Sequence, residues 1–280
     1  MDAIARRQGV VFLFEKVAPL LRSADAVVAN MEGCISTRGI RADKEYTFRA
    51  PPALASALAS AGIRLVTLGN NHAVDFGRVA LIDTLVHLWR ARVWWVGAGT
   101  DSRRAGQAVT LRGQGCSVSV LGFTAIVPRG FAATERLAGV ATLTHCLPVL
   151  ARVRQEADVV IVVPHWGKEN QPQPSPTQRR IARLLAKAGA DLIVGHHPHV
   201  VQGYERIGRT QVLYSVGNFV HTPASSAARR GGILWAEVGR EGVRTLSVTP
   251  LWLSGGRPTV AEPTHAQVVA RAVAPLPVDW

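Results

Sequence analysis

Residues 189–200 read GADLIVGHHPHV, a short apolar run followed directly by three histidines within four residues. The run Asp191–Val194 is typical of a buried strand, and Gly189 ends the helix-patterned segment before it. Packing does not readily explain three imidazoles just after an apolar strand, and neutral imidazole is the commonest metal ligand in proteins. The stretch therefore predicts a strand end that presents His197 and His199 to a metal ion.

The same arrangement of an apolar run followed by unusual polar residues recurs along the chain, with helix-patterned segments between the runs. The expected strands cover residues 24–29, 63–68, 93–96, 117–123, 159–163, 191–194, 212–215, 232–238 and 243–252. The expected helices cover residues 17–22, 51–61, 77–91, 265–273 and a segment from Ser175 or Thr177 to Ala188. This alternation favours an α/β layered fold. Ligands of α/β sheets bind at the carboxyl ends of the strands, where the polar clusters lie.

One of the expected helices, residues 77–91, has apolar residues at helical spacing. We expect it to use Val79, Ile82, Leu85, Val86 and Trp89 as its apolar face.

The polar residues at the strand ends have the chemistry of a metal site with an acid–base group. The pair Asn70-Asn71 can offer an Asn oxygen to a metal, and His72 beside it is a candidate proton donor or substrate contact, oriented by Asp75. Asn pairs also form turns and caps, so this cluster has a purely structural alternative. The residues expected at this edge are Asn30, Glu32, Asn71, His72, Asp75, His165, His197, His199 and Asn218, and Glu169 follows His165 by four residues.

Length and composition indicate a globular chain with a sizeable core. The chain has 280 residues, of which 48 % are hydrophobic and 18 % charged. We expect a single domain over residues 1–280, with a core at about 11–220 and C-terminal strands and a helix in 221–280. No apolar run reaches the roughly 18 residues of a membrane span, and Met1–Val10 leads into a poor signal sequence. The sequence as given therefore predicts a cytoplasmic chain.

The formal net charge of +13, mostly arginine, favours anionic partners such as phosphate esters, acidic polymers, nucleic acid or anionic lipid. Arginine use in a GC-rich genome explains the same charge without a partner. The cysteines Cys34, Cys116 and Cys146 are odd in number and widely spaced, which excludes a disulfide framework and favours small, partly buried side chains.

Five motifs in order, ADAVVANMEGCIS, LVTLGNNHAVDFG, VVPHWGKE, GADLIVGHHPHVVQ and LYSVGNFV, resemble the CapA (PgsA-like) family of bacterial capsule and poly-γ-glutamate synthesis proteins. The match runs from about Val11 to Val220. The resemblance implies a four-layer α/β/β/α sandwich of the calcineurin-like metallophosphoesterase type. Family members open with a strand ending in Gly-Asp, and this chain begins just after that point. We therefore expect the fold to lack its first strand, through a late start assignment or natural divergence.

The resemblance also assigns roles. Glu32, Asn71, His165, His197 and His199 become metal ligands for one or two divalent ions, with Mn, Fe or Zn expected. His72 and Asp75 become the catalytic pair, and Asn30, Glu169 and Asn218 become substrate contacts. Many relatives carry an N-terminal membrane anchor, which would place the protein in the cell envelope if such an anchor has been lost from the sequence.

Three functions follow as hypotheses. The first is a metal-dependent hydrolase of phosphate esters or γ-glutamyl amides in capsule or poly-γ-glutamate metabolism. The second is a non-catalytic component that grips an anionic polymer during synthesis or export. Specific nucleic-acid binding is the third and rests on charge alone, because no basic–aromatic motif accompanies it.

Overall fold

The computed structural model describes residues 9–223 and 225–274. Their contacts group into two compact units, which are unit 1 (Met1–Val109 and Leu121–Val149) and unit 2 (Thr110–Val120 and Leu150–Trp280). The single-domain assignment stays a prediction. Residues 1–8, which hold most of the poor signal sequence, lie outside the described residues.

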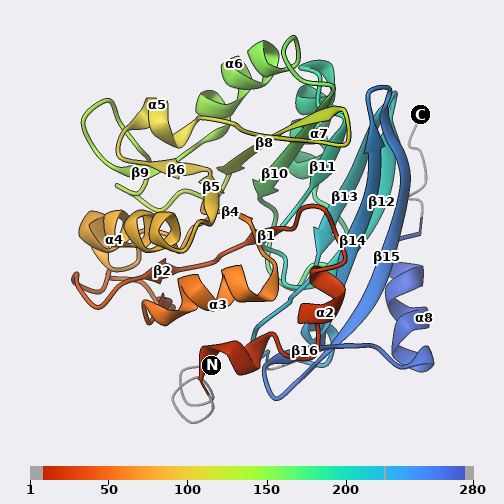
Figure 1. The fold of residues 1–280 in the computed structure, drawn as a ribbon, viewed down its shortest axis with the longest axis horizontal. Helices are drawn as coiled ribbons and strands as arrows, with labels where there is room; N and C mark the ends of the chain where they lie inside the picture. The colour runs from red at the N-terminus through yellow and green to blue at the C-terminus, as the bar shows by residue number, and fades with distance from the viewer. Residues whose placement is uncertain (1–8, 224, 275–280) are drawn as a thin grey trace. The chain divides into compact units, whose positions relative to one another are not determined.

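Unit 1 contains a parallel three-stranded sheet in the order β1-β4-β5 (Figure 1). Its strands are β1 (Val28–Asn30), β4 (Leu65–Thr67) and β5 (Trp94–Val96). Helices α3 (Ala53–Ala61) and α4 (Gly77–Arg90) connect them in turn, as parallel pairing requires. The remaining elements are η1 (Val10–Leu13), α2 (Ala18–Leu21), β2 (Cys34–Ile35), β3 (Arg49–Ala50), β6 (Ala98–Gly99), α5 (Ser102–Ala105), β9 (Gly139–Val140) and α6 (Leu143–Val153), the last of which ends in unit 2.

The first expected strand, residues 24–29, is wrong at its start, because pairing begins only near Val28. The amides of Ser23 and Ala24 still donate to the carbonyls of Leu20 and Leu21, so the chain is closing the turn after α2 at this point. The strand end at Asn30 agrees with the prediction.

Helix α4 agrees with the predicted range, but its predicted apolar face is wrong. The buried side chains are Ala80, Leu81, Thr84, Leu85 and Leu88. Of the five residues expected inside, only Leu85 is buried, and Val79, Ile82, Val86 and Trp89 are exposed. Apolar residues surround this helix, so periodicity alone does not select a face. Hydrogen bonds of Thr84 favour burial of the face that carries Ala80 and Thr84. The Thr84 hydroxyl accepts from the Ile35 amide at 2.8 Å and donates to the Ala80 carbonyl.

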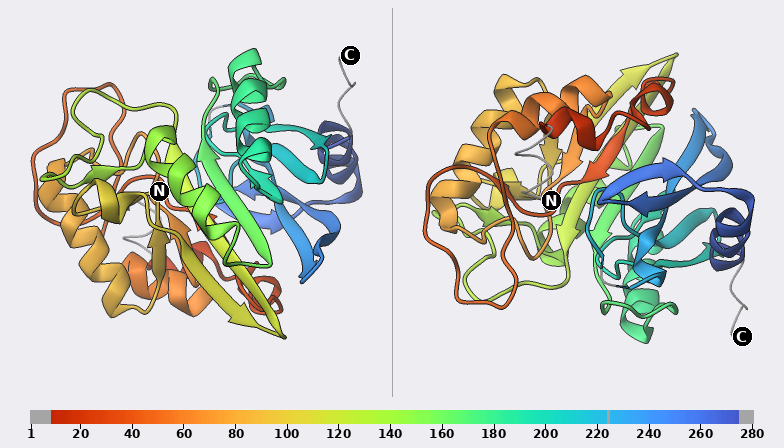
Figure 2. Two further views of the ribbon diagram at one scale, coloured as in Figure 1. Left: turned by 90° about the horizontal axis from the view of Figure 1, so that it is seen from above. Right: turned by 90° about the horizontal axis from the view of Figure 1, so that it is seen from below.

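Unit 2 is built on the six-stranded sheet β12-β13-β11-β10-β8-β7, in which the last residues of β8 belong to unit 1. Strands β10 to β13 are coloured from green to cyan in the two views of Figure 2. Strand β11 pairs in parallel with β10 and β13, whereas β12 and β13 form an antiparallel hairpin. The strands are β7 (Val109–Gly113), β8 (Cys116–Thr124), β10 (Val159–His165), β11 (Leu192–Val194), β12 (Val201–Ile207) and β13 (Thr210–Val216). The parallel strands β10 and β11 end at the loops that carry the histidines.

Helix α7 (Pro176–Lys187) begins as the sequence predicts. The Ser175 side chain accepts from the Gln178 amide, and the Gln178 side chain accepts from the Ser175 amide, which completes a capping box. The helix is followed by Gly189 at φ 102°.

The C-terminal part of unit 2 forms a separate antiparallel sheet, where the sequence predicted two strands and a final helix. Its elements are η2 (Ala227–Arg229), β14 (Arg230–Gly239), β15 (Gly242–Ser254), β16 (Arg257–Val260) and helix α8 (Pro263–Ala272). Among the described helices, none has the length and apolar character needed to cross a bilayer.

Candidate active site

In unit 1, the loops that follow β1 and β4 are joined by Asn70. Its side-chain amide donates to the Met31 carbonyl at 2.9 Å and to Asn30 Oδ1 at 3.2 Å. Its side-chain oxygen accepts from the His72 amide at 3.0 Å. Asn70 is fully buried, so its polar atoms are committed to these bonds. Within the Asn-Asn-His motif, Asn70 therefore has a structural role, whereas Asn71 and His72 are the candidate functional residues.

His72 and Asp75 form the pair that the sequence predicts. The Nδ1 atom of His72 lies 2.7 Å from Asp75 Oδ2, and both side chains are buried. A carboxylate accepts, so Nδ1 carries the proton, and in the neutral ring the lone pair is on Nε2. That Nε2 atom lies 3.9 Å from Glu32 Oε1. Glu32 in turn accepts from Asn30 Nδ2 at 3.1 Å. Unit 1 thus brings Asn30, Glu32, His72 and Asp75 together.

Lys44 is a member of this cluster that the sequence analysis missed. Its Nζ atom lies 2.8 Å from Asp75 Oδ1, 2.7 Å from the Asn71 carbonyl and 3.2 Å from His72 Nδ1. Asp75 also accepts from the Phe48 amide at 2.6 Å, and the Phe48 ring lies 4.2 Å from the His72 ring. Lysine in a polar loop carries no pattern of its own, so no signal in the sequence could have found it.

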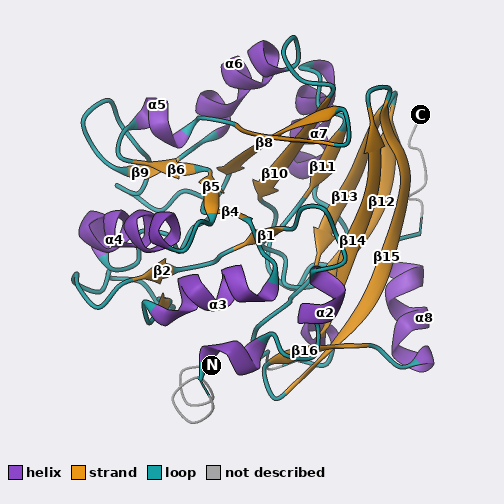
Figure 3. Cartoon of the chain, in the orientation of Figure 1, coloured by secondary structure: helices purple, strands orange, loops and turns teal. Residues whose placement is uncertain are grey.

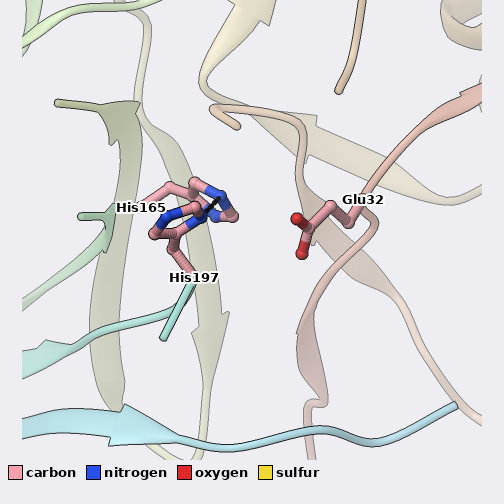
Figure 4. Close-up of side chains that lie close together, drawn as sticks. All are labelled: Glu32, His165 and His197. Atoms are coloured by element: carbon pink, nitrogen blue, oxygen red, sulfur yellow. Dashed lines mark hydrogen bonds between the residues drawn. The ribbon is translucent and has the colours of Figure 1, made fainter. Parts of the chain in front are cut away.

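In unit 2, His165 and His197 are brought together from the ends of β10 and β11 (Figure 4). The Nδ1 atom of His197 lies 3.1 Å from the Nε2 atom of His165, and both side chains are buried. His197 has φ 98° and His199 has φ 59°, a region that non-glycine residues rarely adopt. Such strain costs on the order of 1–3 kcal/mol per residue and concentrates at functional sites.

The backbone between the two strands fixes this pair. The Trp166 amide donates to the His196 carbonyl, and the His196 amide donates to the Pro164 carbonyl. Gly195 permits the close approach, because a Cβ there would meet the Tyr214 carbonyl oxygen at 2.0 Å. Desolvation of the imidazole lowers the pKa of His196 to about 4, so this ring is neutral at physiological pH.

Asn218 orients His199 through a side-chain contact. The sequence analysis expected both residues at the same edge of the sheet. The Asn218 amide nitrogen donates to the carbonyls of His199 and Ala228, which leaves Asn218 Oδ1 facing His199 Nδ1 at 2.8 Å. Nδ1 is therefore the protonated nitrogen, and the lone pair of the neutral ring is on Nε2. The His221 ring stacks on His199 at 5.1 Å, and burial together with the neighbouring His199 lowers the pKa of His221 to about 4.

Glu169 and the three cysteines were also considered in the sequence analysis. Glu169 is exposed on the loop after β10, and the adjacent Asn170 amide ties this loop to the Pro198 carbonyl at 2.8 Å. The three cysteines are free. Burial raises the pKa of Cys34 and Cys146 to about 12, so neither thiol ionises near neutral pH.

Comparison with solved structures identifies the fold. A novel phosphatase from Mycoplasma pneumoniae superposes with a TM-score of 0.58 over 93 % of this chain and 92 % of its own, at 13 % identity. The chain thus shares the α/β fold of this phosphatase, in agreement with the expected fold class. At this level of identity, the similarity shows the fold alone.

Comparison with sequences identifies the family. The chain is 31 % identical to the PGA biosynthesis protein CapA of Bacillus subtilis over 90 % of this chain and 67 % of the relative. It is also 31 % identical to the capsule biosynthesis protein CapA of Bacillus anthracis over 91 % of this chain. It spans 64 % of the length of that second relative. The model of the family described as bacterial capsule synthesis protein PGA_cap matches residues 1–223. The chain belongs to this family of capsule synthesis proteins, as its five motifs had indicated.

Proposed function

We propose that the chain is a divalent-metal-dependent hydrolase that acts on phosphate esters or γ-glutamyl amides in capsule or poly-γ-glutamate metabolism. The observation that carries the proposal is the buried His165–His197 pair, held at 3.1 Å with a strained backbone at His197. Burying two imidazole rings costs free energy unless their nitrogen atoms have polar partners. Metal ligation explains their burial, their proximity and the strain together.

The side chains of unit 2 fit a metal ion. Two nitrogen ligands on one tetrahedral ion are about 3.3 Å apart, because metal–nitrogen bonds are about 2.05 Å long. The distance of 3.1 Å between His197 Nδ1 and His165 Nε2 is close to this spacing and also suits a hydrogen bond between the rings. His199, whose ring centroid lies 6.1 Å from that of His197, is proposed as a further ligand through Nε2, because Asn218 holds the proton on Nδ1. Imidazole nitrogens suit Zn and Fe, and added oxygen ligands also suit Mn.

The proposed ligand set is completed by Glu32 and Asn71, which the family resemblance assigns. When bound, a divalent ion polarises a phosphoryl or carbonyl oxygen and makes a water molecule more acidic. We propose one or two such ions, with Mn, Fe or Zn as the metal.

His72 is proposed to hold and transfer the proton of the reaction at Nε2. Asp75 fixes its tautomer through Nδ1, and Lys44 neutralises the buried carboxylate from the other side. The residues proposed to contact substrate are Asn30, Glu169 and Asn218, and Asn218 also orients His199.

Hydrolysis is tested with the purified, metal-loaded chain on a phosphodiester, a phosphomonoester and a γ-glutamyl peptide. We expect one of these substrates to be cleaved, chelation to abolish cleavage, and His197→Ala to lower kcat/KM by at least about a hundredfold. The matched control is His87→Ala, because His87 is a half-buried histidine of α4 with no proposed role in the site. Failure to cleave any of the three substrates contradicts the proposal.

A second function is supported by the net charge of +13. A basic chain attracts an anionic polymer such as poly-γ-glutamate without catalysing a reaction. Binding of this kind weakens steeply between 50 and about 300 mM salt and ignores His197→Ala. Salt-dependent polymer binding without hydrolysis would favour this second function.

A further inference from the structure

Helix α4 presents an apolar face to solvent. Its exposed side chains are Val79, Ile82, Val86 and Trp89, followed by Arg90, and the first four are spaced to form one stripe. Trp89 is 69 % exposed, and Trp94, at the start of β5, is 61 % exposed. Helix α4 is the purple helix labelled at the left of Figure 3. Its opposite face is packed in the core of unit 1, so the helix has apolar side chains on both sides. An apolar helix face is normally covered.

The charges around this stripe identify what covers it. Arg64, Arg90 and Arg92 are exposed at its tryptophan end. The backbone of Arg64 accepts from the Trp94 amide at 2.8 Å, which places the two residues side by side. The side chain of Asp83, the acidic residue of α4, is 15 % exposed, forms an ion pair with Arg38 and accepts a hydrogen bond from Ser36. The stripe is therefore flanked by positive charge, and its own carboxylate is already paired.

These charges disfavour a second copy as the occupant. Two antiparallel α4 helices would bring the arginines of one copy against the positive N-terminal end of the other. Each chain also carries a formal net charge of +13, which opposes self-association. An anionic surface carries the opposite charge, so it attracts both the arginines beside the stripe and the positively charged chain as a whole.

We propose that the stripe Val79–Ile82–Val86–Trp89, with Trp94 and the three arginines, is a docking face for an anionic lipid surface. Aliphatic side chains enter the boundary between headgroups and acyl chains, and tryptophan is favoured at that depth. The arginines then lie at the level of the lipid phosphates, each contributing attraction that salt screens. This face is peripheral and involves no span of the bilayer.

The test is co-sedimentation of the full chain with vesicles of phosphatidylcholine alone or with 30 % phosphatidylglycerol. We expect binding to the anionic vesicles that falls about tenfold on raising salt from 50 to about 300 mM, and little binding to the neutral ones. The double variant Ile82→Ser/Trp89→Ser and the charge variant Arg90→Glu/Arg92→Glu should each lower partitioning about tenfold. All four positions are exposed, so both variants should keep the melting temperature of the parent chain. If the first variant misfolds, the charge variant still tests the proposal.

The matched control is Leu184→Ser/Arg180→Glu, which removes an exposed leucine and an exposed arginine from α7 in unit 2. It should bind like the parent chain. Equal binding by all variants, or equal binding to neutral vesicles, overturns the proposal. Analytical ultracentrifugation tests the alternative of self-association. If the parent chain is a dimer and Ile82→Ser/Trp89→Ser is a monomer, the stripe is a dimer interface and the proposal is wrong.

Discussion

The Nδ1 atom of His197 and the Nε2 atom of His165 are 3.1 Å apart, although 32 residues separate them in the chain. The parallel pairing of β10 and β11 causes this contact, because parallel strands end at the same edge of a sheet. The left-handed backbone at His197 then turns its ring towards His165. The pair is thus a consequence of sheet topology and local strain acting together.

Lys44 and Asp75 are expected to be energetically coupled. Lys44→Met leaves the buried Asp75 carboxylate with two of its three partners, so the free energy of unfolding should fall by about 2 kcal/mol. In a urea-unfolding cycle with Asp75→Asn, the double variant should lose at least about 1 kcal/mol less than the sum of the single variants. Additive losses would show that the ion pair contributes nothing of its own.

Gly195 is expected to tolerate no side chain. A Cβ would lie 2.0 Å from the Tyr214 carbonyl oxygen and 2.3 Å from Trp166 Nε1, and Trp166 donates to that same carbonyl. Gly195→Ala should therefore lower the free energy of unfolding by about 3 kcal/mol or more. Gly113→Ala is the control, because its Cβ meets nothing within 4 Å, and it should change stability by less than about 1 kcal/mol. Similar values for both variants in urea unfolding would contradict the packing argument.

Asn218 is expected to set metal affinity through His199. Asn218→Ala removes the acceptor that holds the proton on Nδ1 of His199, and loss of such a partner typically costs 10- to about 100-fold in affinity. Competitive titration with a chromogenic chelator measures the change. Asn170→Gly, which retains the positive φ of 59° at an exposed position, should leave affinity unaltered. Unchanged affinity in Asn218→Ala would remove His199 from the ligand set.

The Arg38–Asp83 ion pair is expected to make stability depend on pH in the acid range. Hydrogen bonding to Arg38 lowers the pKa of Asp83 from 3.8 to about 2. A lowered folded-state pKa gives stability that is present above about pH 4 and is lost as the pH falls through about 2. Arg38 is exposed, so solvent screens the pair and its contribution to stability is small.

Arg38→Met should therefore be less stable than the parent chain at pH 5, with a gap that closes towards pH 2. Arg152→Met, which removes another exposed ion pair, provides the control. A gap that stays constant from pH 5 to 2 in thermal melts would show that the pair does not titrate as described.

Sequence patterns predicted the strand ends well because apolar β-branched runs and the polar residues after them are local features. Asn30 and His165 are the last residues of their strands, and Asn71 and His197 lie a few residues beyond theirs. The face of α4 was not predictable in this way, since apolar residues surround that helix and tertiary packing chose the side with Ala80 and Thr84.

Lys44 was beyond prediction for a different reason. It reaches Asp75 across 31 residues from a loop without periodicity, and only the path of that loop brings it there. The same holds for Phe48, whose amide and ring complete the surroundings of His72. Contacts of this kind depend on loop closure rather than on local pattern.

The most direct test of the metal centre is the metal content of the purified chain, measured by mass spectrometry in the parent and in His165→Ala/His197→Ala. We expect near-stoichiometric Mn, Fe or Zn in the parent chain and its loss in the double variant, with His87→Ala retaining the metal. A parent chain that cannot be loaded, or a double variant that keeps its metal, would contradict the assignment of His165 and His197 as ligands.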